Sequence, residues 1–267
     1  MTNTTHDTRS FRFVWWITGG IVALIAAVGI GIYGWGLLTT TTETQNQVYR
    51  QPITALSIDA DAATIVVAAG PAGQVSVHRV LETTKGWKPT ISEQWSGSSL
   101  HVTVKCPDSV LGRKCSIAYA ITVPAATTLA VQSDTGDLTI GDLTARTTVN
   151  TSSGNVTATG LSGPLSVRAD SGEVVGMALT STNATVVAES GNVTLGFAAA
   201  PQSVSASANS GNVTVKVPRT GTAADAYDVV TTVDSGTRDL SVRQPSTTGR
   251  RITVQAESGN VTVGYQS

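Results

Sequence analysis

The chain has 267 residues, 40% of them hydrophobic, so it can bury the core of one large domain or two small ones. Aromatic residues make up only 5%, which favours narrow, regularly stacked coils of small aliphatic side chains over one bulky globular core. The formal net charge is −1 and the basic residues are scattered, so the sequence shows no electrostatic footprint for nucleic acid or an acidic membrane surface.

Residues 1–12 form a short polar tail, and residues 13–38 contain no charged side chain. As a helix, these 26 residues would extend about 39 Å, which exceeds the bilayer core of about 30 Å. Aromatic residues flank the run where interfacial belts form, at Trp16 and Trp35. A cleaved signal peptide is the alternative, but the run is longer than an h-region and no A-x-A site follows it. We expect an uncleaved, single-pass transmembrane helix.

Basic residues precede this span, at Arg9 and Arg12, whereas residues 39–47 contain none. The positive-inside rule therefore predicts a cytoplasmic N-terminus and an extracellular C-terminal domain at the cell membrane. Small residues recur at four-residue spacing within the span: Gly19, Ala23, Ala27 and Gly31. They form either a packing face for another helix or ordinary glycine-rich membrane sequence.

Residues 39–51 are rich in Thr and Gln without apolar periodicity, which predicts a linker. Alternating β-branched residues follow, so strands are expected from there on. Tryptophans and both cysteines gather between residues 85 and 115. Because a solenoid needs an atypical end to cover its first coil, we expect residues 52–125 to form the N-terminal coils and cap.

A disulfide between Cys106 and Cys115 would close a ten-residue loop, worth about 2.7 kcal/mol in the chain-entropy model. Such a bond persists outside the cytoplasm, which agrees with the expected orientation. A metal site is the alternative, but it would need two further ligands at matching spacing. We therefore predict the disulfide.

Residues 126–267 repeat one phrase, whose last copy is AESGNVT at residues 256–262. The copies centre on glycines separated by 18, 18, 19, 20, 25 and 23 residues: Gly136, Gly154, Gly172, Gly191, Gly211, Gly236 and Gly259. A period of this size is typical of solenoids.

Apolar residues recur two and four positions after most of these glycines, and three and five positions before most of them, with threonine at the third position after most copies. This period of two predicts a strand on either side of a Ser-Gly turn in which glycine can adopt φ > 0. A meander of two-residue hairpins fits the same pattern. The repetition of residue types at equivalent positions favours stacked coils. We predict an all-β fold: a parallel β-solenoid with an atypical N-terminal cap, preceded by one transmembrane α-helix.

Residues 119–124 (YAITVP), residues 129–140 and the repeated S-G-N-V-T together resemble the bacterial "putative adhesin" domain-of-unknown-function family, also called toast-rack-like. The resemblance covers about residues 53–267. It implies a parallel β-solenoid that is often membrane-tethered, and it supplies no catalytic residues. The sixth copy departs from the pattern, because Arg238 stands where an inward valine is expected and the coil is longer, with loops expected at 220–226 and 244–250.

Signatures of zinc proteases, serine hydrolases, phosphate-binding loops and dinucleotide sites are absent from the sequence. Stacked coils would nevertheless bring several turn acids into one column: Asp134, Asp137, Asp170, Glu173 and Glu189. Such a column could be a set of solvated turns, a weak Ca²⁺ site or the acids of a polysaccharide-cleaving enzyme. Because Asn and Ser interrupt it, we favour solvated turns and expect no cofactor, no metal and no catalysis.

We therefore expect a membrane-anchored, extracytoplasmic, non-enzymatic interaction, adhesion or envelope-sensing module. Its partner would be an unidentified protein or glycan rather than nucleic acid. The alternative is a polysaccharide-active enzyme that uses the acidic column. Because Gly259 lies near the end of the sequence, its coil is expected to close the stack without a cap. The loops at 220–226 or 244–250, a second copy of the chain or a partner protein could cover it, and we expect self-association or partner binding through this C-terminal coil.

Overall fold

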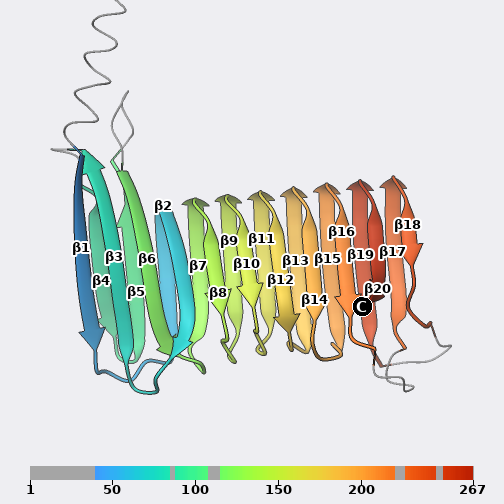
Figure 1. The fold of residues 1–267 in the computed structure, drawn as a ribbon, viewed down its shortest axis with the longest axis horizontal. Coiled ribbons are helices and arrows are strands. Elements are labelled where there is room, and N and C mark those ends of the chain that lie inside the picture. The colour runs from blue at the N-terminus through green and yellow to red at the C-terminus, as the bar shows by residue number, and fades with distance from the viewer. Residues whose placement is uncertain (1–39, 85–87, 108–114, 220–225, 245–248, 267) are drawn as a thin grey trace, which may run out of the picture.

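The structure is a computed structural model that describes residues 40–84, 88–107, 115–219, 226–244 and 249–266. The regular elements in these ranges are β-strands, stacked side by side along one long axis (Figure 1). The predicted tail (1–12) and transmembrane helix (13–38) lie outside the described residues. Within the described ranges, no helix is long and apolar enough to span a bilayer.

The strands form two facing sheets, joined because the long strand β2 (Ala55–Gly70) contributes its first half to one sheet and its second half to the other. In spatial order, sheet I consists of β4 (Thr90–Ser96), β5 (Ser99–Lys105), the first half of β2, β7 (Thr128–Thr135), β9 (Thr147–Ser153), β11 (Leu165–Ser171), β13 (Asn183–Ser190), β15 (Ser203–Ser210), β19 (Arg251–Ser258) and β17 (Asp228–Ser235).

In the same direction, sheet II consists of β1 (Thr40–Tyr49), β3 (Val75–Thr84), β6 (Cys115–Pro124), the second half of β2, β8 (Leu138–Gly141), β10 (Val156–Thr159), β12 (Val174–Leu179), β14 (Val193–Phe197), β16 (Val213–Val217), β20 (Val261–Tyr265) and β18 (Arg238–Leu240). From β7 on, each rung is one strand in sheet I, a Ser-Gly turn (Thr-Gly in the first rung) and one strand in sheet II. Strands of successive rungs pair in parallel, so the fold is a β-solenoid and not a hairpin meander.

The core fills the space between the two sheets and consists mainly of small aliphatic side chains. The inward positions predicted from the repeat are confirmed as buried, for example Val167 and Ala169 before the turn and Val174 after it. In-register stacking places each of these residues against the same position of the next rung, as Val167 pairs with Val149 and Val186. Leu240 in the sixth copy differs, because it is only half-buried.

The rungs at the C-terminal end do not follow the order of the sequence. β19 pairs with β15 on one side and β17 on the other, and β20 likewise lies between β16 and β18. The expectation that the coil of Gly259 closes the stack is therefore wrong: the rung of Gly236 lies outside it and covers it. The expected loops around this rung fall largely on residues 220–225 and 245–248, outside the described ranges.

The N-terminal end is built in a similar way. The second half of β2 lies between β6 and β8. Strands β3–β6, which follow β2 in the sequence, therefore cover the rung that β2 forms. β3 pairs antiparallel with β6, and β4 pairs antiparallel with β5. Residues 40–49, within the predicted linker, instead form the edge strand β1, because all ten of them pair with β3.

Candidate functional site

The Ser-Gly turns stack into a column along one edge of the solenoid, which we call the turn edge. Each turn glycine adopts a positive φ, and a β-carbon there would meet the backbone of the rung before it. At Gly191, φ is 142° and a β-carbon would lie 2.0 Å from the carbonyl oxygen of Gly172. Since a β-carbon cannot approach an oxygen so closely, glycine is required by stacking as well as by conformation.

The residue after most of these glycines bonds to the neighbouring rung through its side chain. Gly154 N and Val156 N donate to carbonyls of the following rung, which leaves the N–H of Asn155 outside the ladder. The carboxylate of Asp137 accepts this N–H at 3.0 Å, and Asn155 Oδ1 in turn accepts the N–H of Glu173 at 3.0 Å. Asparagine therefore recurs here because its carbonyl satisfies a backbone donor that stacking would otherwise leave unpaired.

A second stretch of this amide ladder follows the spatial order of the rungs. Asn192 Oδ1 accepts the N–H of Asn212 at 2.9 Å, and Asn212 Oδ1 accepts the N–H of Asn260 at 2.8 Å. Asn260 Oδ1 then accepts both the N–H and the hydroxyl of Thr237. These turn residues thus have a structural function, which accounts for Asp137 in the predicted acidic column, whereas Glu173 takes part only through its backbone N–H.

The other three predicted acids, Asp134, Asp170 and Glu189, lie on the outer face of sheet I, two residues before their turn glycines. Asp134 and Asp170 line a shallow, open concavity of about 330 Å³ across three successive strands, β7, β9 and β11. Its lining residues are Gln132, Ser133, Asp134, Asn150, Thr151, Ser152, Arg168 and Asp170. These residues are all of polar or charged types and none is aromatic, and the side chains of Ser133 and Thr151 are buried.

Arg168 is the cation of this concavity and contacts two of the acids. Its Nε lies 3.8 Å from Asp170 Oδ1, and its Nη2 donates to Glu189 Oε1 on the adjacent strand β13. All three side chains are about half exposed, so the ion pairs orient the groups more than they stabilise the fold. Among the described residues, no cluster of three or more His, Cys, Asp or Glu side chains could hold a metal ion.

The concavity offers donors and acceptors at spacings fixed by the sheet. Side chains at equivalent positions of neighbouring rungs lie about 4.8 Å apart. Carboxylate, amide and guanidinium groups at this spacing can bond to neighbouring hydroxyls of a sugar chain. Asp134 and Asp170 belong to alternate rungs, with Ser152 between them.

A second polar cluster closes the N-terminal end of the solenoid, and the sequence pattern did not indicate it. Arg79 of β3 reaches across from sheet II to Glu93 of β4 in sheet I, with a distance of 2.6 Å between Nη1 and Oε1. The hydroxyl of Tyr49 donates to the other oxygen of Glu93, and the Tyr49 ring contacts Trp95 edge-on at 5.4 Å. Burial, and then the hydrogen bond to Glu93, raise the pKa of Tyr49 to about 12.

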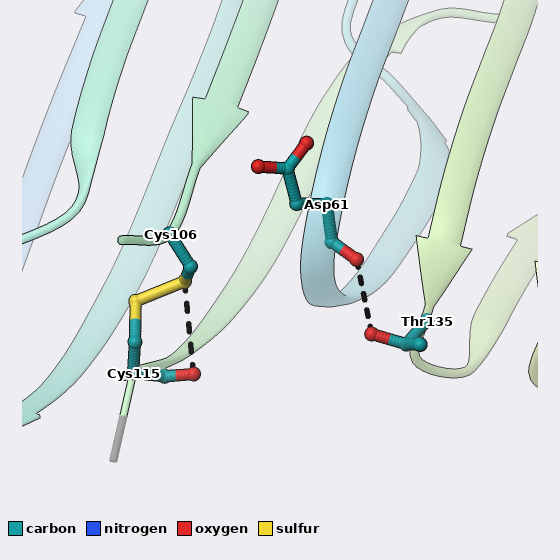
Figure 2. Close-up of a disulfide and its surroundings, with 4 residues drawn as sticks. All are labelled: Asp61, Cys106, Cys115 and Thr135. Carbon is teal, nitrogen blue, oxygen red and sulfur yellow. Dashed lines mark hydrogen bonds between the residues drawn. A yellow bond between two sulfur atoms is a disulfide. The ribbon is translucent and has the colours of Figure 1, made fainter. Parts of the chain in front are cut away.

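Cys106 and Cys115 form a disulfide with a Cα–Cα distance of 6.0 Å (Figure 2). It joins the end of β5 to the start of β6, and so ties sheet I to sheet II next to the cap. Close by, the Thr135 hydroxyl donates to the carbonyl of Asp61 at 2.9 Å, which links the first glycine turn to the part of β2 that passes from sheet I to sheet II. The expected helix-packing residues Gly19, Ala23, Ala27 and Gly31 lie outside the described residues.

Several solved structures resemble this solenoid. A putative adhesin from Bacteroides fragilis NCTC 9343 has a TM-score of 0.54 at 15% identity, over 84% of this chain and 97% of that one. A putative adhesin from Parabacteroides distasonis ATCC 8503 has a TM-score of 0.45 at 10% identity, over 85% and 97%. A putative lipid binding protein from the same strain has a TM-score of 0.41 at 12% identity, over 84% and 97%.

Only the first of these three structures has a TM-score above 0.5, and at 15% sequence identity it supports the fold alone. No curated protein matches the chain. The family described as Toastrack DUF4097 matches residues 99–264, which include the turn glycines, the amide ladder and the concavity. The chain therefore belongs to the Toastrack DUF4097 family.

Proposed function

We propose that the chain is a non-enzymatic adhesion module, anchored in the cell membrane by residues 13–38, that binds a glycan in the concavity on sheet I. The observation that carries this proposal is the convergence of Gln132, Asn150, Arg168 and two carboxylates from three successive rungs. Hydroxyl-rich sugars suit such a surface, because each hydroxyl can donate to a carboxylate and accept from an amide or guanidinium group.

The sequence and the disulfide support an extracellular position for the solenoid. The first strand begins at Thr40, directly after the apolar run, and Arg9 and Arg12 precede that run. The disulfide favours an oxidising environment. On intact cells, an epitope tag at the C-terminus should bind antibody, whereas a tag at the N-terminus should bind only after permeabilisation. The reverse result would contradict the orientation.

A glycan screen with the full-length chain in a neutral detergent tests the binding site. Sugars that bind should lose about tenfold or more in affinity with Asn150→Ala combined with Arg168→Gln, because each lost hydrogen bond to a sugar contributes on the order of 1 kcal/mol. Thr194→Ala combined with Thr214→Ala, on the outer face of sheet II, is the matched control. Equal affinities for the two double variants would exclude the concavity as the binding site.

A polysaccharide-active enzyme is the second candidate, because Asp134 and Asp170 line the same concavity. Such an enzyme would release shorter products from a bound polysaccharide, whereas the adhesion module would not.

A further inference from the structure

Charges are segregated between the two edges of the regular stack. Along the turn edge and the ends of the sheet I strands that lead into it, the described residues include two arginines, Arg168 and Arg238, and eight acids: Asp134, Asp137, Asp170, Glu173, Glu189, Asp234, Asp239 and Glu257. Along the opposite edge, where sheet II strands end and sheet I strands begin, the described residues include six cations and two acids, Asp142 and Asp228. Those cations are Arg146, Lys216, Arg219, Arg243, Arg250 and Arg251.

Five of the six cations gather over the last three rungs, and we call these five the basic edge: Lys216, Arg219, Arg243, Arg250 and Arg251. The interleaved rung order brings them together, although they span 36 positions of the sequence. Tyr265 contacts two of them. The guanidinium of Arg219 lies 4.5 Å from the centroid of the Tyr265 ring, and the Tyr265 hydroxyl accepts the backbone N–H of Arg243.

Backbone bonds place the remaining members at the same edge. Arg250 O accepts the N–H of Asp228 at 2.9 Å, and Arg243 O accepts the N–H of Tyr227 at 3.0 Å. Lys216 lies over the neighbouring rung, because a β-carbon at Gly264 would be 3.0 Å from its Nζ. Glycine at this position therefore leaves the space that the lysine side chain occupies.

Among the described residues, few carboxylates lie near the basic edge. The carboxylate of Asp228 is engaged by Arg251 Nη2 at 2.9 Å. Lys216, Arg219 and Arg243 have no carboxylate partner within the described part of the chain. Uncompensated cations on successive rungs create a positive potential that attracts anions.

We propose that the basic edge binds an anionic polysaccharide whose carboxylate or phosphate groups repeat along the chain. A polymer suits it better than one small anion, because the cations are distributed over several rungs. Contacts of a polymer with several rungs also reinforce one another through effective concentration.

The position of the basic edge favours such a polymer over anionic lipid, an argument that rests on the membrane anchor of the proposed function. The register of β1, β3 and β6 places Thr40 at the turn edge of the N-terminal end. The basic edge lies at the opposite edge and about 40 Å further along the stack, at about 4.8 Å per strand. It would therefore lie far from the bilayer in which the chain is anchored.

The test measures binding of the full-length chain, in neutral detergent, to polygalacturonate, to a phosphate-bearing mannan and to neutral dextran. The edge variant carries Lys216→Gln, Arg219→Gln and Arg243→Gln. A matched control removes the same charge at the N-terminal end of the stack, with Arg50→Gln, Lys88→Gln and Lys105→Gln. Thermal unfolding of each variant verifies that the fold is intact.

At least one anionic polymer should bind, dextran should not bind at the basic edge, and the edge variant should bind the anionic polymer about tenfold more weakly or worse. Raising the salt from about 0.05 M to about 0.3 M should weaken binding further, because the exposed charges become screened. The control should keep its affinity within about twofold. Equal losses in both variants, or no binding of either anionic polymer, would overturn the proposal.

Two further binding measurements test whether anionic lipid or nucleic acid binds the basic edge instead. Tighter binding to vesicles of phosphatidylglycerol and phosphatidylcholine, or to duplex DNA, than to either anionic glycan would also overturn it. The concavity variant with Asn150→Ala and Arg168→Gln separates this proposal from the proposed function. It should keep its affinity for the anionic polymer even if no neutral glycan is found to bind.

Discussion

At the scale of single residues, each turn glycine meets two constraints at once, a positive φ and close contact with the previous rung. Replacing Gly191 by Ala should lower the free energy of unfolding by about 3 kcal/mol or more, because backbone strain and the clash with Gly172 O both oppose stacking. Gly141→Ala is the control: it has no atom within 4 Å of a new β-carbon and should change stability by less than about 0.5 kcal/mol. Urea unfolding compares the two, and equal stabilities would contradict the turn geometry.

Tyr49 makes the cap sensitive to alkaline pH. An unfolded tyrosine has a pKa of about 10, and the folded value is raised to about 12, so the native state holds the proton more tightly. The contribution of protonated Tyr49 to the free energy of unfolding is therefore fully present below about pH 10 and is lost as the pH rises through about 12. Tyr49→Phe should therefore reduce the fall in unfolding free energy between about pH 9 and pH 11.5.

Tyr119 limits the size of this effect, because its burial also raises its pKa, although Arg79 opposes the rise. The Tyr49→Phe variant should consequently keep part of the alkaline destabilisation. Urea titrations at both pH values measure the difference. If the wild type and the variant lost stability in parallel, Tyr49 would not be the responsible group.

At the scale of elements, the spatial order of the last rungs is the least expected feature. Ser258 pairs with Ser210 on one side and Ser235 on the other. Adjacent strands lie about 4.8 Å apart, within the range of a disulfide, whereas Ser210 and Ser235 are two steps apart, at about 9.6 Å.

Pairs of engineered cysteines test this order, because all three serines are exposed. Ser210→Cys with Ser258→Cys, and Ser235→Cys with Ser258→Cys, should cross-link under mild oxidation. Ser210→Cys with Ser235→Cys should not, and mass spectrometry of peptides reads all three results. A stack in sequence order would give the opposite pattern for the two pairs that contain Ser210.

Much of the regular stack was predictable from the sequence, since inward positions, turn glycines and parallel coils all leave periodic signals. The order of the rungs left no periodic signal, although Arg238, which replaces an inward valine in the sixth copy, is consistent with the place of the Gly236 rung at the end of the stack. The strand of residues 40–49 was missed because its Thr and Gln side chains form an exposed edge, where pairing with β3 rather than burial of apolar side chains decides the structure. The concavity and the basic edge arise only when distant residues are stacked.

At the scale of the whole molecule, the two ends of the stack are closed differently. The N-terminal end is closed by the cluster of Tyr49, Arg79 and Glu93. At the C-terminal end, Arg238 and Thr231 occupy inward positions of the last rung and bond to each other at 3.3 Å. Polar groups there reduce the apolar surface that an uncovered rung would expose. Self-association through the C-terminal coil stays a prediction, and its surface would be this rung rather than that of Gly259.

The central claim is that the solenoid binds glycans without converting them. The most direct measurement incubates the full-length chain with the polysaccharides that bind it and follows both complex formation and the release of shorter products. We predict saturable binding with no product above the level of a protein-free control. Products whose formation is abolished by Asp134→Ala or Asp170→Ala, in variants that still fold and bind, would contradict the account and identify an enzyme.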